Sequence, residues 1–263
     1  MNTKIKKTLI TSLFSLGMIS GVASAGIISV SDTDFNSGAG QITFSEFGLG
    51  TTNPFYTAAD YGGDINDPDV SFDGWFLGQS LSGTPAIDCP SAAASACVVG
   101  SPIAPLSLDA ASPDTFITGD GANPTSPVLS GTPTFNGGIA VLFSTDQFGV
   151  GFDGGFFNAV GSTAITAFAR DGSLIGSVAN TITGIEFLGL VTDDNTASIA
   201  GVFLDLIGNE PAGFAIDNIR FGGVDDIDVV SEVSEPTAYL LMLLGMFGIA
   251  VSRRVKNNTN RVD

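Results

Sequence analysis

Two short apolar segments of the chain break a strand-like alternation at a point that contains an acidic residue. The large apolar residues of both segments follow the spacing 2, 3, 2: Ile42, Phe44, Phe47 and Leu49 in the first, and Phe214, Ile216, Ile219 and Phe221 in the second. A regular strand keeps the spacing 2. One extra residue moves later side chains to the other face unless a β-bulge absorbs it. The spacing therefore predicts a bulge beside Glu46 and another beside Asp217.

Glu46 and Asp217 are the residues whose type and position could do chemistry. A bulge brings a carboxylate and nearby carbonyl oxygens together, and hard oxygen ligands suit Ca²⁺. We expect Glu46 and Asp217 to lie on neighbouring strands and to share a structural calcium ion. The alternative is that both carboxylates accept backbone hydrogen bonds or are solvated.

A second acidic group occupies the segment DYGGDINDPD and consists of Asp60, Asp64, Asn66, Asp67 and Asp69. It lacks the order of an EF-hand, since the twelfth loop position counted from Asp60 is Ser71 rather than Glu. We interpret this segment as a polar surface loop, with a calcium site as the alternative.

The residue types available exclude several catalytic classes. The chain has no histidine, so it lacks Ser-His-Asp triads, histidine metal sites and histidine bases. A G-x-S-x-G nucleophile motif is also absent from the sequence. Acids are too numerous for a glycosidase pair to be recognised by sequence. We therefore expect no enzymatic activity.

Trp75 is the candidate for ligand binding, because exposed aromatic rings stack on the apolar faces of sugars. Phe72, Phe76 and Tyr61 are near it in the sequence. The competing interpretation is that Phe72, Trp75 and Phe76 are core residues of a β-sandwich.

The charge of the chain is distributed unevenly. Between residues 26 and 252 the only basic residues are Arg170 and Arg220, against 26 acids, which gives a formal charge of −24. Such a surface repels nucleic acid and anionic lipid, because phosphate binding needs Lys and Arg. Solubility explains most of these acids, and specific cation binding is the alternative.

The elements that position these residues are predominantly strands. Alternating or continuous apolar runs predict strands at 27–31, 41–47, 70–77, 139–143, 148–152, 164–170, 174–178, 185–191, 198–206 and 214–221. Asp171-Gly172 predicts a two-residue hairpin turn. No stretch between residues 26 and 221 shows capped helical spacing. We predict an all-β fold over 26–221, an antiparallel β-sandwich or jelly roll, with a proline-rich insertion at 79–136 and an acidic linker at 222–233.

Residues 1–25 have the three parts of a secretory signal peptide: lysines, an apolar core and the ending Ala23-Ser24-Ala25. We expect export through the Sec translocon and cleavage after Ala25; a retained anchor is the alternative. In an exported chain, Cys89 and Cys97 are expected to form a disulfide that closes a short loop. Reactive thiols are the other possibility.

The end of the chain also has three parts in a fixed order. Ser234, Glu235 and Pro236 precede an uncharged apolar run at 237–252, and Arg253, Arg254 and Lys256 follow it. Pro236 can open a helix, lipid favours a helix whose backbone is bonded internally, and the basic residues stay on the cytoplasmic side. An ordinary tail anchor is the alternative, although the run is shorter than the ~20 residues that a comfortable span needs.

The ending at 234–256 resembles the PEP-CTERM sorting signal that exosortase recognises, with Ser234 in place of the first proline. The segments Ile42–Phe47 and Phe214–Phe221 are also similar to segments of the domain common in PEP-CTERM proteins, and the later one is similar to the closing strand of carbohydrate-binding jelly rolls. The resemblance implies that Asp217 helps to hold calcium. It implies an exported surface or matrix protein of exopolysaccharide or biofilm, with a transient inner-membrane intermediate; the alternative is a calcium-stabilised carbohydrate-binding module.

Overall fold

The computed structural model describes residues 26–89 and 97–229 and forms them into antiparallel sheets with little helix. The predicted all-β class is confirmed. Within these ranges, no helix has the length and apolar character needed to cross a membrane. The predicted signal peptide (1–25), the sorting motif (Ser234, Glu235, Pro236, Arg253 and Arg254) and the apolar run 237–252 lie outside the described residues.

A seven-stranded sheet has the order β1-β13-β10-β15-β8-β7, and β2 also pairs with β15. The strands are β1 (Ile27–Val30), β2 (Gly40–Ile42), β7 (Phe116–Thr118), β8 (Val128–Ser130), β10 (Gly149–Phe157), β13 (Gly184–Thr192) and β15 (Ala215–Gly222). One edge of β15 is shared, because Ile216 lies opposite Leu129 of β8 whereas Ile219 lies opposite Ile42 of β2. β15 is therefore an inner strand with three partners.

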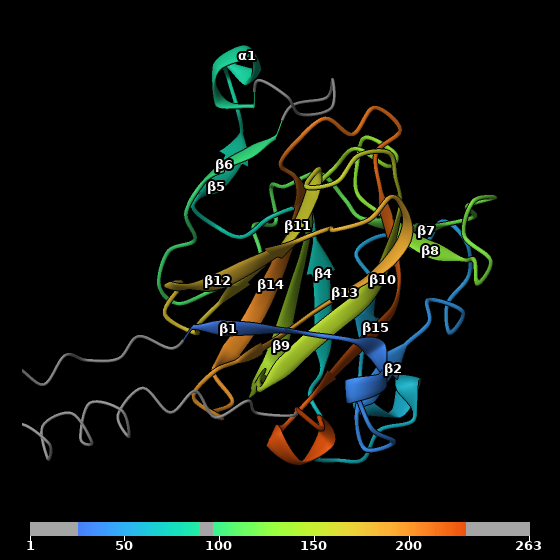
Figure 1. The fold of residues 1–263 in the computed structure, drawn as a ribbon, viewed down its shortest axis with the longest axis vertical. Coiled ribbons are helices and arrows are strands. Elements are labelled where there is room, and N and C mark those ends of the chain that lie inside the picture. The colour runs from blue at the N-terminus through green and yellow to red at the C-terminus, as the bar shows by residue number, and fades with distance from the viewer. Residues whose placement is uncertain (1–25, 90–96, 230–263) are drawn as a thin grey trace, which may run out of the picture. The chain divides into compact units, whose positions relative to one another are not determined.

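A six-stranded sheet faces it, with the order β12-β11-β14-β9-β4-β3. Its strands are β3 (Phe55–Tyr56), β4 (Val70–Asp73), β9 (Ile139–Gln147), β11 (Thr163–Phe168), β12 (Leu174–Ala179) and β14 (Ile199–Leu206). The main core contains buried side chains of both sheets, among them Val141, Leu204, Val150 and Ile216. The molecule is thus a β-sandwich (Figure 1).

The six-stranded sheet is buried on its outer face as well. Ala140, Ala200 and Phe203 alternate with core residues along β9 and β14, and they pack with Phe76 and Leu106 in a second cluster, which we call the outer cluster. All eight residues of β14 are buried. Burial on both faces explains why this strand is a continuous apolar run rather than an alternating one.

The proline-rich segment 79–136 supplies part of this cover and also several elements of its own. It contains β5 (Gln79–Leu81), the short helix α1 (Pro85–Asp88), β6 (Val98–Gly100), β7 and β8. β5 and β6 form a separate two-stranded sheet, which lies with α1 at one end of the sandwich in Figure 1. β7 and β8 add two strands to one edge of the seven-stranded sheet. The segment predicted as an insertion is therefore partly sheet.

The ten predicted strands overlap strands of the structure, but three of their details are wrong. The segments 41–47 and 70–77 leave their sheets early, at Ile42 and Asp73. The Asp171-Gly172 hairpin has a three-residue loop rather than a two-residue turn, because Ala169 N donates to the Ser173 carbonyl oxygen. Gly172, at φ +81°, takes the left-handed position that such a loop requires.

Residues near the two ends of the described part of the chain lie side by side. Phe35 pairs with Ile227 in an antiparallel bridge. Asn36 N donates to the Asp226 carbonyl oxygen at 2.9 Å, and Asn36 Nδ2 donates to the Asp225 carbonyl oxygen at 2.9 Å. The acidic residues at 225–226, predicted to be in a linker, therefore take part in the folded body.

Candidate functional site at the bulge of strand β15

The bulge predicted beside Asp217 is present. Gly151 of β10 lies opposite Arg220 and Asp153 lies opposite Asp217, so Phe152 faces two residues of β15 instead of one. Asn218 has φ +48°, in the left-handed region that asparagine tolerates better than most residues. The extra residue keeps Ile216 and Ile219 on the same, buried side of the sheet.

The first segment departs from its predicted pattern. Phe44 is fully buried at φ +56°, but Phe47 is only half-buried and Leu49 is 70% exposed. The chain leaves the sheet after Ile42, so no strand carries the alternation on to Leu49. Glu46 lies in the turn that follows, where its Oε1 accepts hydrogen bonds from Thr43 N at 3.0 Å and Thr43 Oγ1 at 2.8 Å.

Asp217 is fully buried, and its carboxylate fastens a loop onto the bulge. Its Oδ1 accepts from Asn218 N at 2.7 Å, and its Oδ2 is hydrogen-bonded to Thr125 Oγ1. The amide of Asn218 donates to Asp153 Oδ2 at 2.9 Å and accepts from Gln41 Nε2 at 3.1 Å. The bulge thus joins β2, β10 and β15 to the loop before β8.

The Thr125 hydroxyl has one proton and two acceptors beside it. Besides the Asp217 carboxylate, Thr125 Oγ1 lies 2.9 Å from Asn123 Oδ1, an oxygen that also accepts from Thr125 N at 3.0 Å. A hydroxyl can donate only one hydrogen bond. Thr125 therefore donates to the Asp217 carboxylate or to Asn123 Oδ1, but not to both at once.

Electrostatics raise the proton affinity of Asp217. Burial raises the pKa of Asp217 to about 6; hydrogen bonds from Thr125 and Asn218 oppose the shift, and the nearby carboxylates Asp153 and Glu46 add to it. The pKa of Asp153 is raised as well, first by burial, although the Asn218 amide and the Arg220 charge counteract this. Several carboxylates thus share a buried region in which a proton or a cation is favourable.

Glu46 offers a buried oxygen that suits a cation. Its Oε2 is buried and has no hydrogen-bond partner, and the fully buried hydroxyl of Tyr56 is unpartnered too. The charge of Glu46 acts on both Tyr56 and Asp217. Within residues 26–89 and 97–229, however, no three His, Cys, Asp or Glu side chains gather closely enough to hold a metal ion. A calcium ion here would therefore need hydroxyl, carbonyl or water oxygens in addition to the carboxylates of Glu46 and Asp217.

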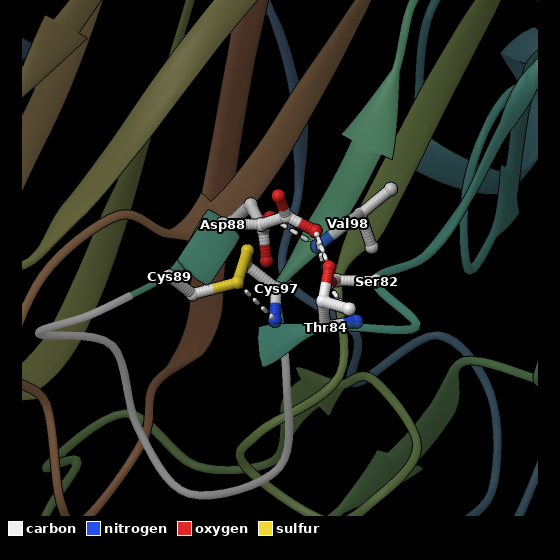
Figure 2. Close-up of a disulfide and its surroundings, with 7 residues drawn as sticks. Ser82, Thr84, Asp88, Cys89, Cys97 and Val98 are labelled. Atoms are coloured by element: carbon white, nitrogen blue, oxygen red, sulfur yellow. Dashed lines mark hydrogen bonds between the residues drawn. A yellow bond between two sulfur atoms is a disulfide. The ribbon is translucent and has the colours of Figure 1, made fainter. Parts of the chain in front are cut away.

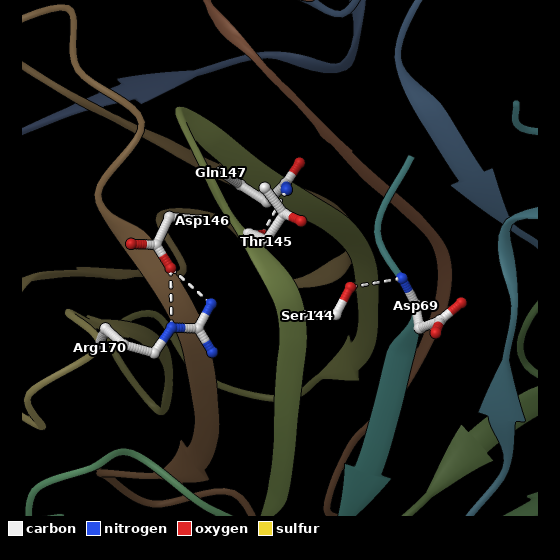
Figure 3. Close-up of polar contacts among 6 residues, drawn as sticks. All are labelled: Asp69, Ser144, Thr145, Asp146, Gln147 and Arg170. Atoms are coloured by element: carbon white, nitrogen blue, oxygen red, sulfur yellow. Dashed lines mark hydrogen bonds and ion pairs between the residues drawn. The ribbon is translucent and has the colours of Figure 1, made fainter. Parts of the chain in front are cut away.

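The second acidic group folds as a surface loop whose carboxylates bind their own backbone. Asp60 Oδ2 accepts from Thr57 N at 2.8 Å, and Asp67 Oδ2 accepts from Asp64 N at 2.6 Å. Figure 3 shows Asp69 N donating to Ser144 Oγ at 2.9 Å, which ties the loop to β9. These contacts agree with the interpretation as a polar loop.

Figure 3 also shows the ion pair next to this loop. Arg170 Nε and Nη2 donate to Asp146 Oδ1, at 2.9 Å and 2.5 Å. One of the two arginines of the body therefore fastens the β11–β12 turn to the end of β9. Both side chains are partly exposed, so the pair contributes little free energy.

Trp75 is half-buried rather than presented as a flat platform. It packs against the outer cluster, and its Nε1 donates to Asp109 Oδ2 at 3.3 Å. Its neighbours Phe72 and Phe76 are buried in the main core and in the outer cluster respectively. Tyr61 stacks edge-on against Phe221 with ring centroids 5.3 Å apart.

The predicted disulfide between Cys89 and Cys97 is confirmed, with Cα atoms 6.0 Å apart. Figure 2 shows Cys97 N donating to Cys89 Sγ at 3.2 Å and Asp88 accepting from the hydroxyls of Ser82 and Thr84. Val98, the next residue, donates its N–H to Asp205 Oδ2 of β14 at 2.9 Å. That bond fastens the disulfide-bearing hairpin to the six-stranded sheet.

The bulge beside Asp217 was predicted from the sequence, but the contacts of Asp153 and Thr125 with it were not. The bulge predicted beside Glu46 does not form, because β2 ends at Ile42. Asp153 had a usable signal, since it is the only charged residue of the apolar strand β10. Thr125 lies in a proline-rich loop without periodicity, and only the folded chain brings it to Asp217. Asp205 was likewise missed, although it is the only charged residue of β14.

Comparison with known proteins adds no assignment: no protein-family model matches the chain, and no curated protein matches it significantly.

Proposed function

We propose that this chain is a non-enzymatic, exported surface or extracellular-matrix protein that exosortase sorts and that associates with exopolysaccharide in biofilm. One observation carries the proposal: an acidic-proline motif, an apolar run and a basic cluster follow one another at 234–256. The signal-peptide pattern at 1–25 supports export, and a disulfide suits an oxidising compartment. The inner membrane would hold the chain only in transit, through residues 237–252.

The acidic body supports the same role. Residues 26–229 contain 24 acids, two arginines and no lysine, a formal charge of −22. Such a surface stays soluble and excludes nucleic acid as a partner. Delivery to the cell surface or matrix therefore fits both the terminal segments and the body between them.

Mass spectrometry of the native protein from culture medium and cell surface tests this proposal. We expect a mature N-terminus at Gly26 and a C-terminus near Glu235, and accumulation of a longer form in cells that lack exosortase. The control is a chain in which Arg253 and Arg254 are both replaced by Asn, which should also remain unprocessed. Full-length, unprocessed protein in the cytosol would refute the proposal.

A second candidate function is a calcium-stabilised, jelly-roll carbohydrate-binding module. The observation that favours it is the buried Oε2 of Glu46, which has no hydrogen-bond partner. The charge of Glu46 also raises the pKa of the buried Asp217 carboxyl. A calcium ion would draw on these two carboxylates and would balance their negative charge. The ion would stabilise the fold by holding the turn after β2 against β15.

Thermal unfolding with calcium and with chelator tests the metal. We expect calcium to raise the Tm of the wild-type protein and to have no effect on the double variant Glu46→Ala with Asp217→Ala. Asp69→Asn is the matched control, because that carboxylate lies outside the bulge. Equal melting of the wild type in calcium and in chelator would remove the calcium site.

Glycan binding is tested separately. A glycan array probed with the wild type and with Trp75→Ala should show binding that depends on Trp75 if the protein recognises polysaccharide through this ring. Binding that persists unchanged in the variant would exclude Trp75 as the sugar platform. A hydrolysis screen on the bound glycans should release no product if the chain is non-enzymatic.

A further inference from the structure

One pocket is lined both by the disulfide and by a buried carboxyl group of the six-stranded sheet. Cys89, Cys97, Asp88 and Asp205 all line this pocket, whose volume is about 220 Å³. Asp205 belongs to β14 of the six-stranded sheet, whereas the cysteines flank the start of β6. The fold therefore places a titratable group from the sandwich beside a bond that thiols can cleave.

Asp205 is only 7% exposed, and its two oxygens are unequal. Oδ2 accepts from Val98 N at 2.9 Å, whereas Oδ1 is buried without any hydrogen-bond partner. A buried, unpaired carboxylate oxygen costs free energy. Protonation of Asp205 lowers that cost because it removes the buried charge, so this residue is suited to hold a proton and to give it up when a nearby group needs one.

The two sulfur atoms are unequal as well. Cys89 is half-buried and accepts the N–H of Cys97 at 3.2 Å, whereas Cys97 is 8% exposed. Cys89 is thus the sulfur open to an incoming thiol, and Cys97 is the inner one, adjacent to the residue that binds Asp205.

We propose that Cys89, Cys97 and Asp205 form a thiol–disulfide exchange site that accepts an external thiol at Cys89, with Asp205 transferring the proton to and from Cys97. This inference does not depend on the proposed sorting or on calcium.

The exchange balances with a thiol as the only co-reactant. An external thiolate attacks Cys89 Sγ and forms a new S–S bond as the Cys89–Cys97 bond breaks. The electron pair of the broken bond leaves with Cys97 Sγ, which takes the proton of Asp205 and becomes a thiol. In the reverse direction, the Asp205 carboxylate removes that proton, Cys97 attacks Cys89, and the external thiolate is released.

The proton affinity of Asp205 suits this role. Burial raises its pKa to about 7, opposed by hydrogen bonds from the N–H groups of Val98 and Leu206. A group with a pKa near the working pH serves as both acid and base. Asp88 is the other titratable acid lining the pocket, and its carboxylate is bound by Ser82 and Thr84. The two cysteines do not titrate while they are joined.

The rate of disulfide reduction in the purified oxidised protein tests the site. Dithiothreitol is the probe, samples are quenched with a maleimide between pH 5.5 and 8.5, and mass spectrometry counts the modified cysteines. Rates are divided by the thiolate fraction of the probe. In the wild type this corrected rate should fall about tenfold between pH 6 and pH 8, as general-acid assistance from Asp205 is lost.

The variant Asp205→Asn keeps an acceptor for Val98 N but has no proton to transfer, so its corrected rate should be low and independent of pH. Asp88→Asn is the matched control and should behave like the wild type. If Asp205→Asn does not fold, Asp205→Glu replaces it and should keep a pH dependence with a displaced midpoint.

Three results would overturn the proposal: a wild-type disulfide that dithiothreitol does not reduce under native conditions, a corrected rate that does not change with pH, or a pH dependence that both Asp205 variants leave unaltered. In each case the disulfide would be a structural bond only.

Discussion

Two buried carboxyl groups, one in the bulge of β15 and one in β14, affect how the stability of the protein responds to acid. Asp217 and Asp205 are buried carboxyls with pKa values raised to about 6 and about 7. In the unfolded chain both return to the ordinary pKa near 3.9. Below their folded-state pKa values, the folded protein holds protons that the unfolded chain does not. The free energy of unfolding contributed by these two residues therefore rises as the pH falls from 7 towards 4.

Asp217→Asn tests this contribution in metal-free buffer with chelator. Because the variant cannot take up the proton, we expect it to lose ~2–4 °C of the acid-induced rise in Tm, which corresponds to about 1 kcal/mol for a domain of this size. Circular dichroism melts at pH 7 and pH 5 measure the difference. The rise that remains comes from Asp205 and from the other carboxyls whose pKa is raised, Asp153 and Asp73.

Asp171→Asn is the control for that comparison. Hydrogen bonds from Ser173 hold the pKa of this exposed carboxyl below its usual range, so its effect on stability has the opposite sign. An acid-induced rise that is identical in Asp217→Asn and in the wild type would show that Asp217 is ionised throughout.

A bound calcium ion would reverse the trend, because calcium binds the ionised carboxylates. Stability would then be lost as the pH falls and protons displace the metal. The same melts repeated with calcium thus separate a proton-stabilised bulge from a metal-stabilised one.

At the scale of elements, the outer cluster makes the proline-rich segment part of the core. Phe203 of β14 is 5% exposed and points away from the main core, into the cluster that includes Phe76 and Leu106. The cover is fixed by backbone hydrogen bonds, among them Leu106 N to the Arg170 carbonyl oxygen at 2.8 Å. Deleting the cover would leave the apolar outer face of the six-stranded sheet in water.

Phe203→Ala tests the contribution of the outer cluster. Truncating a buried phenylalanine costs about 3–5 kcal/mol, so the midpoint of denaturant unfolding should fall substantially. The matched control is Phe55→Ala, whose ring is 51% exposed and whose loss should change stability by less than about 1 kcal/mol. Equal effects of the two substitutions would mean that the cover contributes no core.

The limits of prediction from sequence also lie at this scale. Ten strands were found because apolar periodicity runs over four or more residues of the sequence at each of them, although β2 itself spans only three residues. β3, β5, β6, β7 and β8 were missed because two or three residues carry no period. The bulge was found because Ile216 and Ile219 break the period by one residue, but the partners of Asp217 were not, since Asp153 and Thr125 reach it only through strand pairing and loop folding.

Over the molecule as a whole, acidic residues far outnumber basic ones. Within residues 26–89 and 97–229, one ion pair is present, Arg170 with Asp146, and the formal charge over 26–229 is −22. Like charges repel one another and destabilise the compact state. Added salt therefore screens mainly the repulsion between carboxylates. It weakens few attractive ion pairs, so it should stabilise the folded protein.

We expect the Tm to rise by several degrees between about 0.01 M and 0.3 M sodium chloride, over which the screening length falls from about 30 Å to well below 10 Å. Differential scanning calorimetry at pH 7.5 measures the rise, and potassium chloride at equal ionic strength should reproduce it. A Tm that falls with added salt would mean that attractive ion pairs dominate.

The late position of β15 in the sequence has a consequence for biogenesis. Among the strands of residues 26–89 and 97–229, this one is made last, yet β10, β2 and β8 all pair with it, and the bridge between Phe35 and Ile227 closes after it. A chain emerging from its N-terminus therefore leaves three strand edges open until almost the entire body is available. During that interval the nascent protein is vulnerable to edge-to-edge aggregation, and any ribosome stall or truncation before residue 215 would yield a product that cannot complete its sheet.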